Sequence, residues 1–123
     1  MSGIERIGVT RRWSDAVIYG GTAFFVEVAD DPNQDARGQT AQILAQIDAR
    51  LALFSSDRTQ LLQVLIYLAD LADGAVLNEL WENWVPMGHA PARACVQAGL
   101  AAGYRVEMVI TAAAPKSTSH GQE

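Results

Sequence analysis

The sequence predicts one α+β domain over residues 1–112, in which two helices cover one face of a sheet of five or six strands. Segments rich in Val, Ile, Phe and Tyr alternate with segments of helical periodicity, in the order β-β-α-β-α-β-β. The 123 residues are 50% hydrophobic and 19% charged, which is typical of a single globular domain. Residues 113–123 lose the hydrophobic pattern, and we expect a flexible C-terminal tail there.

The first half of the chain predicts two strands and a helix. Residues 11–19 and 22–29 are β segments separated by Gly20 and Gly21, which indicate a hairpin or tight bend. A short additional strand at the N-terminus is compatible with this order. From residue 35 to residue 53, apolar residues recur at helical spacing among Ala and Gln, with Gly38 a weak point near the helix start.

The second half begins with a strand that is apolar at nearly every position, Leu61–Leu68. Such a strand is covered on both faces. A second helix is predicted over residues 74–84, with Leu77, Trp81 and Trp84 on its apolar stripe and Pro86 beyond its end. Because two helices cover only one face of the sheet, we expect another copy of the chain to cover the other face.

Residues 91–97 and 104–111 are the last two predicted strands, and their short connection favours an antiparallel hairpin. A register symmetric about Ala101 places Cys95 opposite Glu107 and Arg93 diagonal to it, which gives one polar patch. An arginine fork can bind a planar carboxylate, and a glutamate can orient or deprotonate water. A simple cross-strand ion pair on a solvated face is an equally open interpretation.

Other chemical candidates are weaker. Cys95 has no clear partner that would make it a thiolate, and a lone cysteine is more often a small buried hydrophobe. His89 and His120 are far apart and have no clustered ligands, so no metal site is predicted. Trp81 and Trp84, at helical spacing, are interpreted as core residues.

Composition excludes several classes of protein. A net charge of -5 and a pI near 4.9 oppose binding to nucleic acid or to an anionic membrane. One cysteine excludes a disulfide within the chain and fits a cytoplasmic setting. The early charges Glu5 and Arg6 argue against a secretory signal, and the longest apolar stretch, residues 61–69, is too short to span a bilayer.

The segment Gly88-His-Ala-Pro-Ala-Arg93-Ala-Cys95-Val96, followed by Tyr104-Arg-Val-Glu107-Met-Val-Ile-Thr-Ala112, resembles the signature of the Rid/YjgF family of reactive-intermediate deaminases. The similarity extends over about residues 15–112. Residues 39–51 resemble the first family helix, residues 61–71 the central strand and its exit, and residues 77–81 the start of the second helix.

The resemblance implies a chorismate-mutase-like fold, assembled as a homotrimer with active sites between subunits. It also implies hydrolysis of enamines and imines such as 2-aminoacrylate to 2-keto acids and ammonia, without metal or cofactor. Carried onto this chain, Arg93 clamps the substrate carboxylate, the backbone at Cys95 holds the imine nitrogen and Glu107 positions the attacking water. Asn78 matches a polar family position near the site.

Two departures from the family pattern alter the expected pocket wall. Gly20, which we assign to the substrate-binding set, stands where the deaminases usually carry a small hydroxyl residue. The N-terminal tyrosine of the family has no clear counterpart in residues 10–13. A trimeric protein that uses Arg93 to bind a small carboxylate metabolite without turnover therefore remains an alternative. A nucleic-acid-directed regulator or nuclease is disfavoured by the acidic charge balance.

Overall fold

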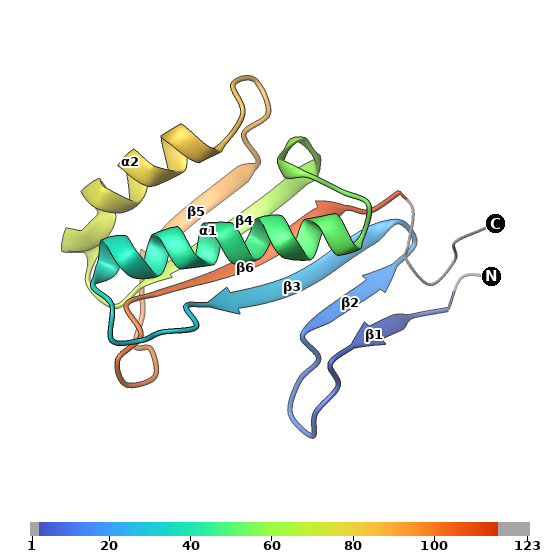
Figure 1. The fold of residues 1–123 in the computed structure, drawn as a ribbon, viewed down its shortest axis with the longest axis horizontal. Coiled ribbons are helices and arrows are strands. Elements are labelled where there is room, and N and C mark those ends of the chain that lie inside the picture. The colour runs from blue at the N-terminus through green and yellow to red at the C-terminus, as the bar shows by residue number, and fades with distance from the viewer. Residues whose placement is uncertain (1–2, 116–123) are drawn as a thin grey trace.

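The computed structural model describes residues 3–115 and confirms the α+β class, with a six-stranded sheet covered on one face by two helices (Figure 1). The strands are β1 (Glu5–Ile7), β2 (Ala16–Tyr19), β3 (Thr22–Val28), β4 (Leu61–Leu68), β5 (Ala92–Gln97) and β6 (Val106–Ala113). The helices are α1 (Ala36–Leu53) and α2 (Gly74–Trp84), and two short 3-10 turns are η1 (Arg58–Gln60) and η2 (Leu71–Asp73). Neither helix of the described chain is long and apolar enough to cross a membrane.

Both helices lie where the periodicity predicts them. The side chain of Asp35 caps α1 by accepting a hydrogen bond from the Gly38 amide at 2.8 Å, which stabilises the first turn despite the glycine. The first long strand is shorter than predicted, because the Thr10 hydroxyl accepts hydrogen bonds from the amides of Arg12 and Trp13. That turn delays the start of β2 to Ala16.

The predicted hairpin between the last two strands is wrong. The strand order is β1-β2-β3-β6-β4-β5, so β4 lies between β5 and β6. It pairs parallel with β5 and antiparallel with β6. The reason is the helix that connects β4 to β5: a chain that crosses one face of a sheet through a helix returns parallel to the strand it left. Strand β6 then enters between β3 and β4.

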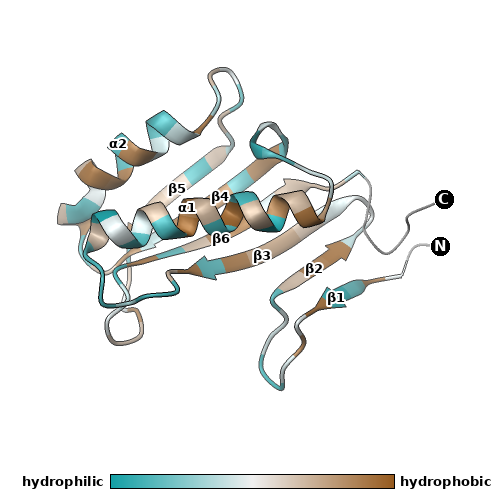
Figure 2. Ribbon diagram, in the orientation of Figure 1, coloured by the Kyte–Doolittle hydropathy of each residue, from teal (hydrophilic) through white to brown (hydrophobic). Residues whose placement is uncertain are grey.

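The core lies between the sheet and the helices. Alternate residues of β3, β4 and β6 point towards α1 and α2 and are almost fully buried. Its largest fully buried apolar side chains are Phe54, Ile43, Ile47, Leu51, Ile66, Leu68, Leu77, Met108 and Ile110. Apolar residues therefore run along the helices and along the central strands beneath them (Figure 2).

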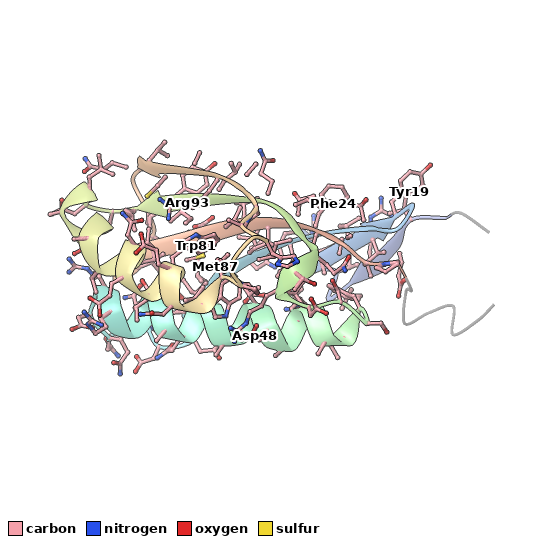
Figure 3. All side chains as sticks on the ribbon, turned by 90° about the horizontal axis from the view of Figure 1, so that it is seen from above. Tyr19, Phe24, Asp48, Trp81, Met87 and Arg93 are labelled. Atoms are coloured by element: carbon pink, nitrogen blue, oxygen red, sulfur yellow. The ribbon has the colours of Figure 1, made fainter. Side chains whose placement is uncertain are left out.

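The opposite side of the sheet, called here the back face, is apolar and open in the single chain. Its side chains come from residues that alternate with the core set: Val17, Tyr19, Phe24, Val26, Leu65, Tyr67, Val96, Glu107 and Val109. Tyr19 and Phe24 project away from the helices, and Phe24 is 46% exposed (Figure 3). Strand β4 is thus apolar on both faces, as its sequence predicts.

The predicted tail begins within ordered structure. Ala113 is the last residue of β6, and Ala114 is buried and donates its N–H to the Gly21 carbonyl at 2.8 Å. The remainder of the predicted tail, residues 116–123, lies outside the described residues.

Candidate functional site

Arg93 and Cys95 lie on the helix-facing side of β5. Arg93 pairs in register with Val64 and Cys95 pairs with Ile66, and these two β4 residues point into the core. Partners opposite each other in a ladder share a face of the sheet. Strand β5 is at the edge of the sheet, so the side chains of Arg93 and Cys95 lie at the rim of the core. Arg93 is exposed there and Cys95 is half-buried.

The guanidinium of Arg93 lies over an aromatic ring. Its Cζ is 5.5 Å from the centroid of the Trp81 ring, which belongs to α2 (Figure 3). Arg37, Arg50, Arg58 and Arg105 each form an ion pair with a carboxylate. Within residues 3–115, Arg93 forms no ion pair and its side chain no hydrogen bond. Its five N–H donors can therefore serve an anionic ligand.

The backbone of Cys95 faces the free edge of β5. The Ala98 amide donates to the Leu68 carbonyl of β4 at 3.0 Å. Because backbone N–H directions alternate along a strand, the Val96 N–H also points towards β4, whereas those of Arg93 and Cys95 point away from it. No strand of the described chain pairs along this edge. A backbone donor at Cys95 thus lies beside the Arg93 side chain.

Glu107 is not part of this group in the single chain. It opposes Tyr67 of β4 and Val28 of β3, which puts it on the back face, where it is half-buried. Arg93 is two strands away and on the other side of the sheet. The polar patch expected from the hairpin register is therefore not formed within one chain.

Asn78 and Gly20 lie in different parts of the fold: Asn78 is on α2, and Gly20 is in the turn between β2 and β3. Asn78 is exposed on α2, three residues before Trp81, so the two side chains are neighbours on the helix surface. Gly20 and Gly21 form the two-residue turn between β2 and β3, with φ angles of 59° and 80° that favour glycine. In the sheet, the strands β3, β6 and β4 separate this turn from β5. Gly20 is therefore not close to Arg93 within one chain.

The segment from β5 to β6 is held by a buried amide. Gln39, fully buried on α1, donates to the carbonyls of Pro32, Gln34 and Gly103 and accepts from the Arg105 amide. The Arg105 side chain in turn binds Asp73 at 2.9 Å. That hydrogen bond raises the pKa of the Arg105 guanidinium. Glu107 thus follows directly on a firmly anchored turn.

The histidines and acidic residues offer no metal centre in the described part of the chain. No group of three His, Cys, Asp or Glu side chains there could hold a metal ion. The Nδ1 of His89 lies 3.1 Å from the carbonyl of Met87 in the turn after α2. His120 falls outside the described residues.

Trp81 is the residue that sequence reasoning did not assign to the site. Its place on the apolar stripe of α2 correctly predicts a buried ring, 6% exposed. The contact with Arg93 was not predicted because it depends on the direction of β5. A strand, a helix and a strand in succession favour a parallel crossover, and a parallel β5 lies beneath α2, with Arg93 turned towards the helix.

Comparison with known proteins gives consistent results. The sequence model of the family described as Endoribonuclease L-PSP matches residues 3–114. The RutC family protein YoaB of Escherichia coli strain K12 is 46% identical over 111 residues, which are 89% of this chain and 97% of that protein. A crystal structure of an uncharacterised Pseudomonas aeruginosa protein matches with a TM-score of 0.87 and 45% identity, covering 90% of this chain and 98% of the other. NMB1025 of Neisseria meningitidis, a member of the YjgF protein family, matches with a TM-score of 0.85 and 44% identity, over 91% and 95% of the two chains.

Proposed function

The chain belongs to the Endoribonuclease L-PSP family and is similar to a RutC family protein and to a member of the YjgF protein family, and from this we propose that it hydrolyses reactive 2-imino acids and their enamine tautomers. The products are 2-keto acids and ammonia. The observation that carries the proposal is the Arg93 guanidinium, which has an aromatic ring against it but no carboxylate of the described chain. The family's name refers to a ribonuclease, but a net charge of -5 favours a small substrate over RNA.

The proposed site lies between two copies of the chain in a homotrimer. The open apolar back face needs a cover, and Phe24, Val26 and Val96 are each nearly half exposed in the single chain. Closing this face with other copies would bring Glu107 and Gly20 of one copy towards β5 of another. The number three comes from the resemblance to the Rid/YjgF family.

In the proposed reaction, Arg93 binds the substrate carboxylate through two parallel hydrogen bonds. The backbone at Cys95 holds the imine nitrogen, and Asn78 lies one helical turn before the Trp81 ring at the same rim. Glu107 of the neighbouring copy positions water for attack on the imine carbon and takes its proton. This proton passes to the imine nitrogen, which gives a carbinolamine. The proton of its hydroxyl group then moves to the same nitrogen, so that ammonia leaves and the carbonyl group of the 2-keto acid remains. No metal ion or cofactor enters this scheme.

The separation of Arg93 from Glu107 within one chain supports a second candidate function. A chain whose copies did not bring Glu107 to Arg93 would still present a carboxylate receptor, and it would bind a small carboxylate metabolite without turning it over. Gly20, which lacks the hydroxyl group usual in the family's deaminases, fits this alternative.

Turnover of a freshly generated imine distinguishes the two functions. An amino-acid oxidase produces the 2-imino acid in situ, and 2-keto-acid release is followed with and without the protein. We expect the protein to accelerate release well beyond spontaneous hydrolysis, with no change after chelator treatment. An unchanged rate, together with binding of a 2-keto acid measured by calorimetry, would support the binding protein instead.

A further inference from the structure

We propose that Trp81 is a positioning residue for Arg93, which holds the guanidinium plane so that its edge is presented to a planar carboxylate. This inference rests on the proposed function, because it concerns how the same site takes its ligand. Its basis is the 5.5 Å separation between the Arg93 Cζ and the centroid of the Trp81 ring (Figure 3). A guanidinium within about 6 Å of an indole centroid is attracted by the negative face of the ring.

The same chain contains a complete version of this arrangement. The Cζ of Arg58 lies over the Trp84 ring, 5.0 Å from the ring centroid. The edge of Arg58 donates two hydrogen bonds, both of 2.8 Å, to the carboxylate of Asp48. One guanidinium can therefore lie against a tryptophan ring and donate two hydrogen bonds to a carboxylate at the same time. Arg93 has the ring, and the carboxylate in the proposed function is that of the substrate.

The Trp81 ring is itself held in place. It is 6% exposed and packs on Trp84, with the ring centroids 5.6 Å apart. The Trp84 Nε1 donates to the Asp48 carboxylate at 3.1 Å, which fixes the second ring against α1. Arg93 is exposed at the edge of the sheet, where an unsupported side chain would sample many rotamers. The stack narrows these rotamers before the ligand arrives and so reduces the entropy lost on binding.

The test compares three changes on α2. Trp81→Leu keeps an apolar side chain without a π face, and a fluorinated tryptophan at position 81 keeps the ring shape but weakens its attraction for a cation. Glu82→Gln is the control, because Glu82 is exposed on the same helix and forms no ion pair within residues 3–115. The probe is 2-ketobutyrate, a product of the proposed reaction, and its dissociation constant is measured by calorimetry on the assembled protein.

We expect Trp81→Leu to weaken 2-ketobutyrate binding roughly three- to tenfold, with an intermediate loss for the fluorinated ring and none for Glu82→Gln. KM for the in situ imine should rise by a similar factor while kcat changes little. In an Arg93→Gln background the same changes at position 81 should have no further effect. A merely structural role of Trp81 would instead lower stability and leave the affinity of the folded protein unchanged.

The outcomes separate this inference from the proposed function. Equal affinity in the fluorinated and wild-type proteins, or losses that simply add to those of Arg93→Gln, would overturn the positioning role alone. A wild-type protein that neither binds 2-ketobutyrate nor hydrolyses imines would overturn the proposed function, and the positioning role with it. If Trp81→Leu fails to assemble, the fluorinated ring still decides, since its shape is that of tryptophan.

Discussion

The side-chain amide of Gln39, on α1, donates a hydrogen bond of 2.9 Å to the carbonyl of Gly103 in the segment between β5 and β6. Its oxygen accepts from the Arg105 amide at 2.8 Å, two residues before Glu107. One buried side chain therefore joins the start of α1 to the turn that leads into the proposed catalytic strand. The two N–H bonds of the amide are shared among three backbone carbonyls, and one of the two lone pairs of its oxygen accepts from a backbone amide.

Gln39→Met, of similar volume, should lower the free energy of unfolding by roughly 2–4 kcal/mol, because several buried backbone groups lose their partner at once. Urea unfolding at a fixed protein concentration measures the loss. Gln42→Met on the same helix removes a single acceptor for the Asp31 amide and should cost only about 1 kcal/mol. Equal losses in the two variants would contradict the assigned role of Gln39.

Glu79 should contribute to the pH dependence of stability. Arg37 donates hydrogen bonds of 3.2 and 2.9 Å to its carboxylate, and these lower the pKa of Glu79 below its usual 4.5. Its contribution is therefore present above pH 4.5 and is lost as the pH falls through the lower folded value. Both side chains are more than half exposed, so the effect is small and is screened by salt.

We expect Glu79→Gln to lower Tm slightly at neutral pH and low salt, and to reduce the loss of Tm between about pH 5 and pH 3. Glu82→Gln, on the same helix, is the matched control, because Glu82 forms no ion pair within residues 3–115. Scanning calorimetry of both variants across this range decides the matter. Identical pH profiles for the two would show that the Arg37 contact does not stabilise the fold.

The back face should mediate assembly into a homotrimer. Phe24→Glu places a charge among Val17, Val26 and Val109, which would be costly to bury, and should shift the protein from trimer to smaller species in light scattering. Leu53→Glu is the control, since Leu53 is similarly exposed, at 53%, but lies on α1. A wild-type monomer at micromolar concentration would contradict the covering argument, whereas a dimer would contradict only the number taken from the family.

The sequence predicts the two helices and β4 within a residue or two, because local periodicity and caps determine them. The capping side chain of Asp35 and the alternation of apolar residues act over short distances. Strand order depends instead on long-range pairing. The insertion of β6 between β3 and β4 leaves no local trace, so a short connection between residues 97 and 106 was interpreted as a hairpin.

For the candidate site, too, the local relationships could be predicted from the sequence and the long-range ones could not. Arg93 and Cys95 share a face by simple alternation, which the sequence shows directly. The relation of Arg93 to Glu107 depended on the hairpin and was wrong for a single chain. The contact between Arg93 and Trp81 can be predicted only when it is known which face of the sheet α2 covers. Residue types therefore suggest candidate side chains, while the fold decides which of them lie together within one chain.

Arg93→Lys and Arg93→Ala should both reduce imine turnover, with Ala the more severe. Lysine retains the charge but cannot supply two parallel hydrogen bonds in a plane. Loss of a desolvated carboxylate contact of about 3 kcal/mol corresponds to about a hundredfold in kcat/KM, which a continuous keto-acid assay resolves. Arg37→Ala is the control, because Arg37 already pairs with Glu79. An assembled Arg93→Ala protein with wild-type turnover would exclude the carboxylate clamp.

Mixing two inactive variants tests whether the site is shared between copies. Arg93 lies on the helix-facing side of β5 and Glu107 on the back face of β6, so one chain does not place both beside the same small substrate. Arg93→Ala and Glu107→Gln should each abolish most activity alone. When the two proteins are unfolded, mixed in equal amounts and reassembled, about a quarter of the interfaces should combine an intact Arg93 with an intact Glu107 from different copies.

We therefore expect the mixture to recover roughly a quarter of the wild-type rate, a figure that follows from random assembly of copies. Each variant reassembled by itself is the control and should remain inactive. A double variant, Arg93→Ala with Glu107→Gln in one chain, mixed with wild type gives the reverse comparison: an interface is intact there only when both of its copies are wild type. If both residues of a site came from one chain, the first mixture would stay inactive and half of the sites in the second would be active, which would place the reaction within a single copy.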